Sequence, residues 1–183
     1  MPTVKQSVFY LKGSSLELLI GAGSSRVKQF HLGESEWKEL ITLDINEDHN
    51  PDVVHDLEVL PYPFEDNQFD EIHAYEVLEH TGAQGDYKFF FAQFSELWRI
   101  LKPDGVLYAT VPEWKSIWAW GDPSHKRIIN EGTIVFLSQK EYEQQVGITA
   151  MSDFRYLYKA DFNIVHASYE GDQFCFALRA IKS

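Results

Sequence analysis

An apolar run that ends in Gly-x-Gly, Leu16-Glu-Leu-Leu-Ile-Gly-Ala-Gly-Ser-Ser-Arg26, constrains the fold of this chain more than any other feature. Such a run near the N-terminus is typical of the first strand and turn of a nucleotide-binding α/β domain, because glycines let backbone N–H groups approach a ligand closely. The third glycine of the dinucleotide fingerprint is missing, and Arg26 stands in its place. That departure argues against NAD and FAD.

Strand-like and helix-like segments alternate along the rest of the chain. The periodicity predicts a short helix at 25–30, strands at 39–43, 52–56, 69–74 and 106–111, and a closing hairpin formed by 162–167 and 173–181. This alternation indicates an α/β fold with a mainly parallel sheet and an antiparallel edge.

The strongest helical pattern runs from Asp86 to Leu101. Apolar residues recur there at three- and four-residue spacing, while Gln93 and Arg99 fall on the other side. The sequence Lys102-Pro-Asp-Gly105 then predicts a turn before the fifth strand.

Composition limits the class of protein. A chain of 183 residues predicts a single domain, 1–183, and a net charge of −12 argues against nucleic acid and anionic membranes as partners. The start, 1–6, lacks the basic and apolar sections of a signal peptide, so a soluble, cytoplasmic protein is expected. The lone Cys175 lies in an apolar run and is expected to be a small buried hydrophobic residue.

The pattern lapses between Pro112 and Gly147, which predicts an insertion that acts as a lid or binding loop. Three tryptophans crowd into it, Trp114, Trp118 and Trp120. They could stack on a planar or sugar acceptor, but aromatic side chains more often bury their area, so packing against the sheet is expected.

Two acids follow predicted strands at the edge where ligands of open α/β sheets bind. Asp44 lies about twenty residues beyond the glycine turn, the spacing at which a carboxylate accepts both ribose hydroxyls. Asp56 ends the next strand and is placed to accept from an adenine amino group, with Leu57 against the ring. Each acid alone is equally compatible with a turn cap. Together, after Gly-x-Gly, they favour an adenosine site.

Several further segments have the same order as motifs of one family. They are Leu19-Ile-Gly-Ala-Gly23, Leu43-Asp-Ile45, Asp52-Val-Val-His-Asp-Leu57, Leu60-Pro-Tyr-Pro-Phe-Glu-Asp-Asn-Gln-Phe-Asp-Glu-Ile72, Val77-Leu-Glu-His80, Leu97-Trp-Arg-Ile-Leu-Lys-Pro-Asp-Gly105 and Trp120-Gly-Asp-Pro-Ser-His-Lys-Arg127. On these segments the chain resembles the class I S-adenosylmethionine-dependent methyltransferases, particularly a group of small bacterial and phage members.

The resemblance implies a Rossmann-like three-layer sandwich with a mainly parallel seven-stranded sheet and an antiparallel C-terminal strand. It also implies S-adenosylmethionine as the cofactor, in a pocket built from the glycine turn, the two acids and the segment after the fourth strand. The residues assigned to that pocket are Gly21, Ala22, Gly23, Arg26, Asp44, Ile45, Asp56, Leu57, Tyr75 and Glu76.

The chain departs from the family pattern at the glycine turn. Leu19 stands where many members carry an acid, and Glu17 lies two positions earlier on the same strand face. Ser25 replaces a common third glycine, and the following Arg26 either pairs with the methionine carboxylate of the cofactor or is an exposed helix residue.

Two histidines are candidate catalytic residues. His80 follows the fourth strand near the expected methionine end, and His125 lies in the tryptophan-rich insertion. Either could deprotonate a hydroxyl or amine of the acceptor. The alternatives are that His80 packs beneath the loop and that Asp122-Pro-Ser-His125 is only a structured turn.

A second cluster, Asp48-His-Asn-Pro-Asp-Val-Val-His-Asp56, lacks a recognised ligand spacing, so no metal site is expected there. The sequence thus favours methyl transfer to a small-molecule or glycan-like acceptor. A nicotinamide oxidoreductase and a non-catalytic cofactor-binding subunit are the alternatives. The acceptor's identity and the oligomeric state stay open.

Overall fold

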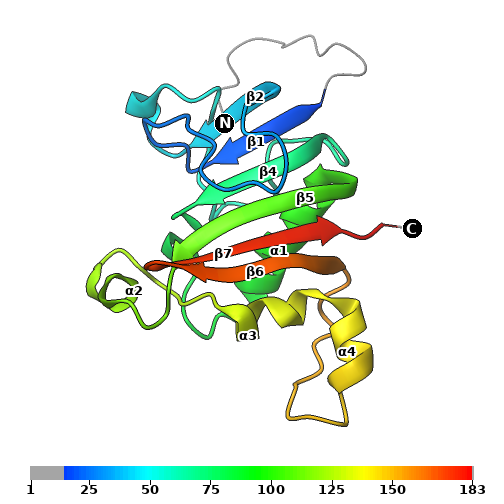
Figure 1. Cartoon of the computed structure of the whole chain (residues 1–183). Helices are drawn as coiled ribbons and strands as arrows, with labels where there is room; N and C mark the ends of the chain where they lie inside the picture. The colour runs from blue at the N-terminus through cyan, green and yellow to red at the C-terminus, as the bar shows by residue number, and fades with distance from the viewer. Residues whose placement is uncertain (1–14, 183) are drawn as a thin grey trace.

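A seven-stranded sheet organises the computed structural model, which describes residues 15–182 (Figure 1). The expectation about residues 1–6 therefore lies outside the described residues. The strand order is β3-β2-β1-β4-β5-β7-β6. The strands are β1 (Leu16–Ile20), β2 (Glu39–Asp44), β3 (Val53–Val54), β4 (Phe69–Tyr75), β5 (Leu101–Pro112), β6 (Phe162–Glu170) and β7 (Gln173–Ala180).

Only β7 runs against the other strands. It pairs antiparallel with both β5 and β6, whereas β1 to β5 pair in parallel. The expected α/β sheet with a reversed C-terminal strand is confirmed. All five residues of β1 are buried, as a central parallel strand requires.

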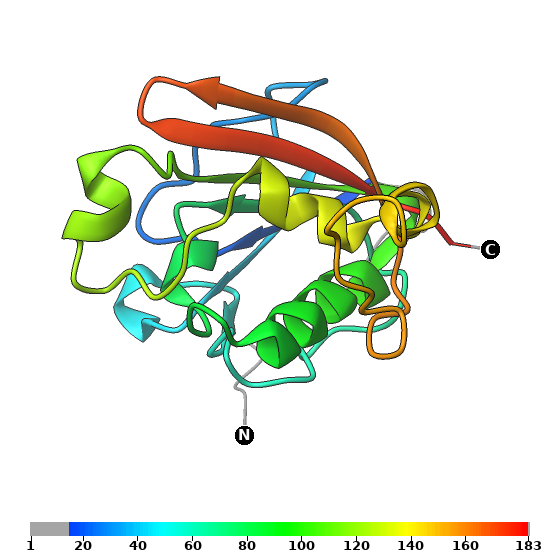
Figure 2. The same ribbon diagram turned by 90° about the horizontal axis from the view of Figure 1, so that it is seen from below.

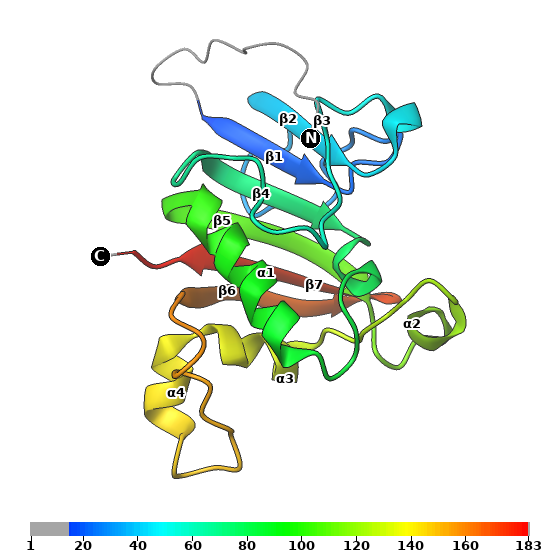
Figure 3. The same cartoon turned by 180° about the vertical axis from the view of Figure 1, so that it is seen from behind.

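The long helix α1 (Tyr87–Ile100) lies across one face of the sheet (Figure 3). The Asp86 carboxylate caps it by accepting from the Phe89 N–H. Its apolar stripe packs Phe91, Phe94 and Leu97 into the main core. The predicted helix is confirmed, but the prediction that Gln93 lies on its polar side is wrong. Gln93 is fully buried because its amide hydrogen-bonds Thr81 and Tyr62.

On the opposite face, coil lies over part of the sheet near β1 and β4, where a helix was predicted at 25–30 (Figure 1). No helix or strand forms between Gly23 and Lys38. Lys28 turns inward, and its ammonium pairs with Glu17 at 3.2 Å and Glu71 at 2.9 Å. Phe30 packs in a second apolar cluster with Cys175, which is buried as expected. Burial raises the pKa of the Cys175 thiol to about 11. Lys28 and Phe30, on either side of Gln29, both point inward. Residues two apart share a face in an extended chain but not in a helix, so this pattern suits an extended path.

The remaining helical elements are short. They are η1 (Glu47–His49), η2 (Leu78–His80), α2 (Ile117–Gly121), α3 (Glu131–Ile134), η3 (Val135–Leu137) and α4 (Gln139–Gln145). The predicted turn at 102–105 is instead the start of β5, because Leu101 already pairs with Phe69 across a bulge. Seen from below, α3 and α4 lie beside the edge strand β6 (Figure 2).

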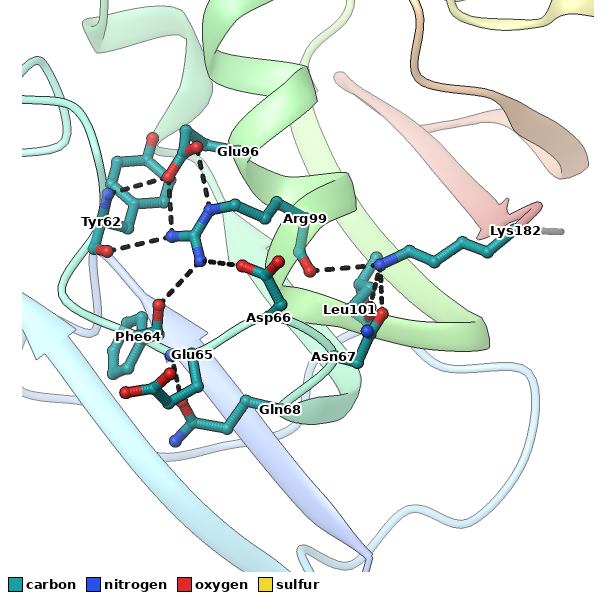
Figure 4. Close-up of polar contacts among 10 residues, drawn as sticks. All are labelled: Tyr62, Phe64, Glu65, Asp66, Asn67, Gln68, Glu96, Arg99, Leu101 and Lys182. Carbon is teal, nitrogen blue, oxygen red and sulfur yellow. Dashed lines mark hydrogen bonds and ion pairs between the residues drawn. The ribbon is translucent and has the colours of Figure 1, made fainter.

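Arg99 of α1 fixes the proline-rich loop that precedes β4 (Figure 4). Its guanidinium donates to the carbonyls of Tyr62 and Phe64 and pairs with Glu96 and Asp66. Two prolines keep this loop out of regular secondary structure, so its backbone carbonyls need other partners, and the Arg99 guanidinium supplies them. Across residues 15–182, no helix is both long and apolar enough to cross a membrane.

Candidate functional site

A cavity of about 390 Å³ opens at the carboxyl ends of β1, β2, β3 and β4. Its volume lies within the usual range for small-molecule sites. Parallel strands end at the same edge, so the turns after them meet although they are far apart in the sequence. The lining residues are Gly21, Gly23, Leu43, Asp44, Ile45, His49, His55, Asp56, Leu57, Glu58, Val77, His80, Thr81 and Lys126.

The two glycines of the first turn differ in what surrounds them. Gly21 has a φ of +60°, and a Cβ there would lie 2.3 Å from Cγ2 of Val77. Gly23 has a φ of +54°, but a Cβ there would meet no atom within 4 Å. Gly21 therefore lets the turn pack against Val77, whereas Gly23 lies beside open space. That space is the cradle a ligand needs.

Asp44 joins the ends of β1 and β2. Its carboxylate accepts from the Gly23 N–H at 2.7 Å and from the Asn46 N–H at 2.8 Å, and it lies 3.3 Å from Nδ1 of His49. A carboxylate has about four acceptor positions. Three of these positions are used, so the buried Asp44 carboxylate can accept one more hydrogen bond. Asp44 borders the cavity, and a ligand there could donate that bond.

Asp56 and the apolar residues beside it border the same space. One oxygen of Asp56 accepts from the Glu58 N–H at 2.9 Å, and no protein hydrogen bond is made by the other oxygen in the described part of the chain. Leu57 is buried, whereas Ile45 is 65 % exposed. Two acids with open acceptor positions beside apolar side chains suit the hydroxyls, amino group and ring of an adenosine. The residues therefore fit S-adenosylmethionine.

Not every residue assigned to the pocket lines it. The cavity lining includes Gly21, Gly23, Asp44, Ile45, Asp56, Leu57 and His80, but not Ala22, Arg26, Tyr75, Glu76 or His125.

Arg26 binds protein groups instead of facing the cavity. Its guanidinium donates to the carbonyls of Ala22, Gly23, Ser25 and His49. The positive charge therefore holds the glycine turn against the loop that follows β2. Arg26 lies in coil and is therefore not an exposed helix residue, whereas its pairing with the methionine carboxylate of the cofactor stays a prediction.

Ala22, Tyr75 and Glu76 lie outside the cavity lining. Ala22 and Tyr75 pack in the second apolar cluster, where the Tyr75 hydroxyl donates to the Phe30 carbonyl. Glu76 accepts from the Gln173 amide at 3.0 Å, and burial raises the pKa of its carboxyl. These three residues support the strand ends in this structure.

Sequence reasoning missed the other lining residues. His49 and His55 were considered only as metal ligands, and each instead contacts protein groups, Asp44 and the Val59 carbonyl respectively. Lys126 comes from the insertion and pairs with Glu58 at 2.8 Å. Two signals pointed to the insertion, the lapse in pattern that predicts a lid at 112–147 and the motif that ends at Arg127, but neither singled out Lys126.

Buried Arg127 anchors the insertion beside the cavity. It donates to the Leu78 carbonyl, the Thr81 hydroxyl and the Gln93 side-chain carbonyl. Burial lowers the pKa of its guanidinium to about 10. The backbone N–H groups of Lys126 and Arg127 both donate to the Glu79 carbonyl. These bonds fix the 122–127 turn on η2.

His80 and His125 come together at this docking point. Their ring centroids are 4.6 Å apart. His80 lines the cavity, whereas His125 does not. Burial is the first cause of the lowered pKa of His80, and the nearby His125 is the second. Glu79 lies beside both rings and is buried, which raises the pKa of its carboxyl to about 8.

The three tryptophans are not packed against the sheet, so that prediction is wrong. Trp118 is 63 % exposed and Trp120 is 70 % exposed, and Trp114 is also exposed. The short helix α2 projects from the end of β5 (Figure 1), and Trp120 is tied only to its own loop, by a bond to the Trp114 carbonyl. A projecting helix offers these rings no apolar layer to cover.

The sequence is similar to one protein family. The family model described as "Methyltransferase domain" matches residues 18–109, which include the glycine turn and both acids. The chain belongs to this methyltransferase family. None of the curated proteins matches it. The enzyme is an S-adenosylmethionine-dependent methyltransferase, as the sequence resemblance implied.

Solved structures share the fold of this methyltransferase. An S-adenosylmethionine-dependent methyltransferase from Archaeoglobus fulgidus is 18 % identical, with 93 % of this chain and 88 % of that one covered and a TM-score of 0.58. The N-methyltransferase NodS from Bradyrhizobium japonicum WM9, in complex with S-adenosyl-L-homocysteine, is 14 % identical, with coverages of 92 % and 79 % and a TM-score of 0.55.

A third similar structure contains a partner. It is a complex between the Haloferax volcanii Trm112 methyltransferase activator and a methyltransferase, 12 % identical, with coverages of 92 % and 83 % and a TM-score of 0.56.

The alternative of a nicotinamide oxidoreductase loses its structural basis. In that class a helix N-terminus binds the pyrophosphate, and in the described chain coil follows Gly23.

Proposed function

We propose that this methyltransferase transfers a methyl group from S-adenosylmethionine, held in the strand-end cavity, to a small-molecule or glycan-like acceptor that binds along 114–127. The observation that carries the proposal is the arrangement of the cavity. Asp44 and Asp56 lie among the strand turns that line the cavity. His80 of η2 lines it as well, and Lys126 brings the insertion to its edge.

In the proposed donor site, Asp44 accepts from the ribose hydroxyls and Asp56 accepts from the adenine amino group. Ile45 and Leu57 contact the apolar faces of the nucleoside, and the open space beside Gly23 takes the amino-acid end. When bound, the cofactor supplies an electrophilic methyl group on a sulfonium. The protein's contribution is alignment and the exclusion of water.

The proposed acceptor site uses the insertion, 112–147, as a lid. Exposed indole rings on α2 are suited to stacking on a sugar ring or planar group. The helix leads directly into the 122–127 turn, whose Lys126 lines the cavity. With a net charge of −12, an uncharged or cationic acceptor is favoured over a polyphosphate backbone.

Calorimetric titration tests the donor site. The wild-type protein is expected to bind S-adenosylhomocysteine. Asp44→Ala is expected to reduce affinity by about 10- to 100-fold, since hydrogen bonds to a charged group are worth about 1.5–3 kcal/mol. Asp48→Ala is the matched control, because its exposed carboxylate lies outside the cavity lining. Equal affinity in all three folded proteins, or none in the wild type, would contradict the proposed site.

A methyl-transfer assay over glycans and small hydroxyl or amine compounds tests the acceptor site. Trp118→Ala with Trp120→Ala is expected to raise the acceptor KM while donor affinity is unchanged. Tyr156→Ala removes an equally exposed aromatic ring outside the cavity lining and is expected to have no effect. An acceptor KM that is identical in all of these variants would exclude the tryptophans from acceptor binding.

The exposed apolar side chains of α2 also favour a second candidate function, that of a subunit acting with a protein partner. Ile117, Trp118 and Trp120 expose most of their surface, and large exposed apolar patches mark interaction sites. One structural neighbour is a methyltransferase in complex with an activator protein. This candidate predicts that the isolated chain binds the donor but transfers no methyl group to any compound in the panel.

A further inference from the structure

Three side chains that can ligate a metal converge at the rim of the donor cavity. Nε2 of His80 lies 3.7 Å from Oε1 of Glu79, and Nε2 of His125 lies 4.0 Å from the same oxygen. One ligand atom from each residue lies within 4.8 Å of the others. Ligand atoms bonded at about 2.1 Å to one ion lie roughly 3–4 Å apart. Small side-chain rotations therefore suffice to close the three atoms around an ion.

Glu79 needs a partner that the protein does not supply. Its side chain is about 3 % exposed, and in the described chain neither carboxylate oxygen makes a hydrogen bond. Buried polar atoms are rarely left unpaired, and each such case calls for an explanation. Nδ1 of His125 is also buried and without a partner among the described residues. Three of the five buried side-chain atoms without a hydrogen bond among the described residues therefore belong to this cluster; the other two are on His49 and Thr110.

The ring of His80 is oriented for ligation. The Ser124 hydroxyl donates to Asp122 at 2.6 Å, so its oxygen accepts the Nδ1–H of His80 at 3.1 Å. This places the proton of a neutral ring on Nδ1 and leaves the lone pair of Nε2 toward Glu79. Metal-binding histidines usually have such a hydrogen bond on their other nitrogen, which fixes the tautomer.

We infer that Glu79, His80 and His125 form a binding site for a first-row divalent transition-metal ion such as Zn²⁺. Two imidazoles and one carboxylate are a ligand set that such ions prefer and that leaves coordination positions open for water or a ligand. Since His80 also lines the cavity, an ion held there would lie beside the donor site of the proposed function, on which this part of the inference rests. Ligation through Nε2 replaces the general-base role predicted for the two histidines.

The other cluster of possible ligands in the described chain does not share these properties. Glu17, Glu71 and His73 also lie within ligand distance of one another. However, the Lys28 ammonium already pairs with both carboxylates, at 3.2 and 2.9 Å. A cation of the protein therefore occupies that position, whereas the Glu79 carboxylate has none bonded to it in residues 15–182.

Titration of the full, chelator-treated chain with ZnCl₂, without donor or acceptor, tests the site. One ion per chain is expected. His80→Ala and His125→Ala are each expected to weaken binding at least about tenfold, and Glu79→Gln likewise. His31→Ala, at a half-buried residue, and Glu36→Gln, at an exposed one, both lie outside the cluster and are expected to bind as the wild type does. Binding of Co²⁺ should give d–d absorption bands that shift in the histidine variants.

Two results would overturn the inference. One is the absence of stoichiometric Zn²⁺ binding by the wild type. The other is binding that survives unchanged in a His80→Ala/His125→Ala double variant. If Glu79→Gln fails to fold, the histidine variants still decide, with circular dichroism as the folding control. A parallel titration of His125→Ala with S-adenosylhomocysteine separates the two proposals, because His125 lies outside the cavity lining and its loss is expected to leave donor binding intact.

Discussion

The two ends of the cavity are built differently. At the proposed donor end, short turns after β1 to β3 bring Gly23 and Asp44 together, and the Asp44 carboxylate is already bonded to backbone N–H groups. At the proposed acceptor end, a turn from the distant insertion docks on η2 through Arg127, and Glu79 stays without a hydrogen bond in the described structure. The acid at the first end is tied by backbone hydrogen bonds, whereas the buried acid at the second end has none among the described residues.

This difference indicates where ligand chemistry is left to be supplied. A preorganised donor end needs little rearrangement to bind an adenosyl group, which reduces the ordering cost of binding. Buried groups without partners at the acceptor end are costly to the free protein, and an ion or acceptor there would relieve that cost. We therefore expect donor binding to tolerate changes at the acceptor end better than the reverse.

The largest effect is expected at the first turn. Gly21→Ala should destabilise the protein by about 4 kcal/mol, since its Cβ would overlap Val77 and its backbone is left-handed. Gly23→Ala is the matched control with a similar φ and open space, and about 1–2 kcal/mol is expected from the backbone alone. Urea unfolding measures both. Equal losses would show that packing against Val77 does not hold the turn.

The next largest effect is expected at the anchor of the insertion. Arg127→Met removes the donor from three buried acceptors and should cost about 3 kcal/mol of unfolding free energy. Donor affinity should change less than about threefold if the two ends are independent. Arg155→Met, at an exposed ion pair, serves as the control. A large loss of donor affinity in folded Arg127→Met would break the comparison.

A smaller effect, confined to binding, is expected at Asp56. Asp56→Ala should weaken S-adenosylhomocysteine binding roughly tenfold, the value of about one hydrogen bond to a charged group. Asp56→Asn keeps an acceptor oxygen and should retain most of the affinity. A donor analogue that lacks the adenine amino group should lose affinity for the wild type but not for Asp56→Ala. An equal loss for both proteins would separate Asp56 from the adenine.

The smallest effect is expected at the Glu58–Lys126 pair, which bridges the two ends. Its hydrogen bond to Lys126 is the first cause of the lowered pKa of Glu58. The pair's stabilisation is therefore present above pH 4.5, the ordinary pKa of the carboxyl, and is lost as the pH falls below it. Both side chains are more than a third exposed, so solvent screening keeps the effect below about 1 kcal/mol.

Thermal unfolding of the wild type and Glu58→Gln at pH 7 and pH 3 measures the stabilisation that the Glu58–Lys126 pair contributes. The difference between the two proteins should be present at pH 7, shrink at pH 3 and fall with added salt. A difference that grows on acidification would contradict the sign derived from the lowered pKa.

The donor end was largely predictable because strand ends follow one another in sequence and in space. Buried runs end at Gly21, Asp44 and Asp56, and parallel pairing brings these ends together. The path of the chain after Gly23 was not predictable. A helix at 25–30 is plausible locally. However, Lys28 pairs with Glu17 and Glu71, and both of these acids lie on strands of the sheet.

The acceptor end depends on contacts between distant residues. Gln93 has a polar side chain in an amphipathic pattern, and its burial is favourable because Tyr62, Thr81 and, from the insertion, Arg127 all bond its amide. The exposure of Trp118 follows from α2 projecting beyond the sheet, which composition does not reveal. The convergence of Glu79 with His125 likewise requires the docked turn, although His80 and its neighbour Glu79 were visible in one motif.

A crystal structure of the protein with S-adenosylhomocysteine tests the central claim most directly. We predict ribose hydroxyls within hydrogen-bond distance of the Asp44 carboxylate, the adenine amino group on Asp56, and the sulfur turned toward His80. An adenosyl group bound elsewhere, or carboxylates of Asp44 and Asp56 that point away from the ligand, would contradict the account.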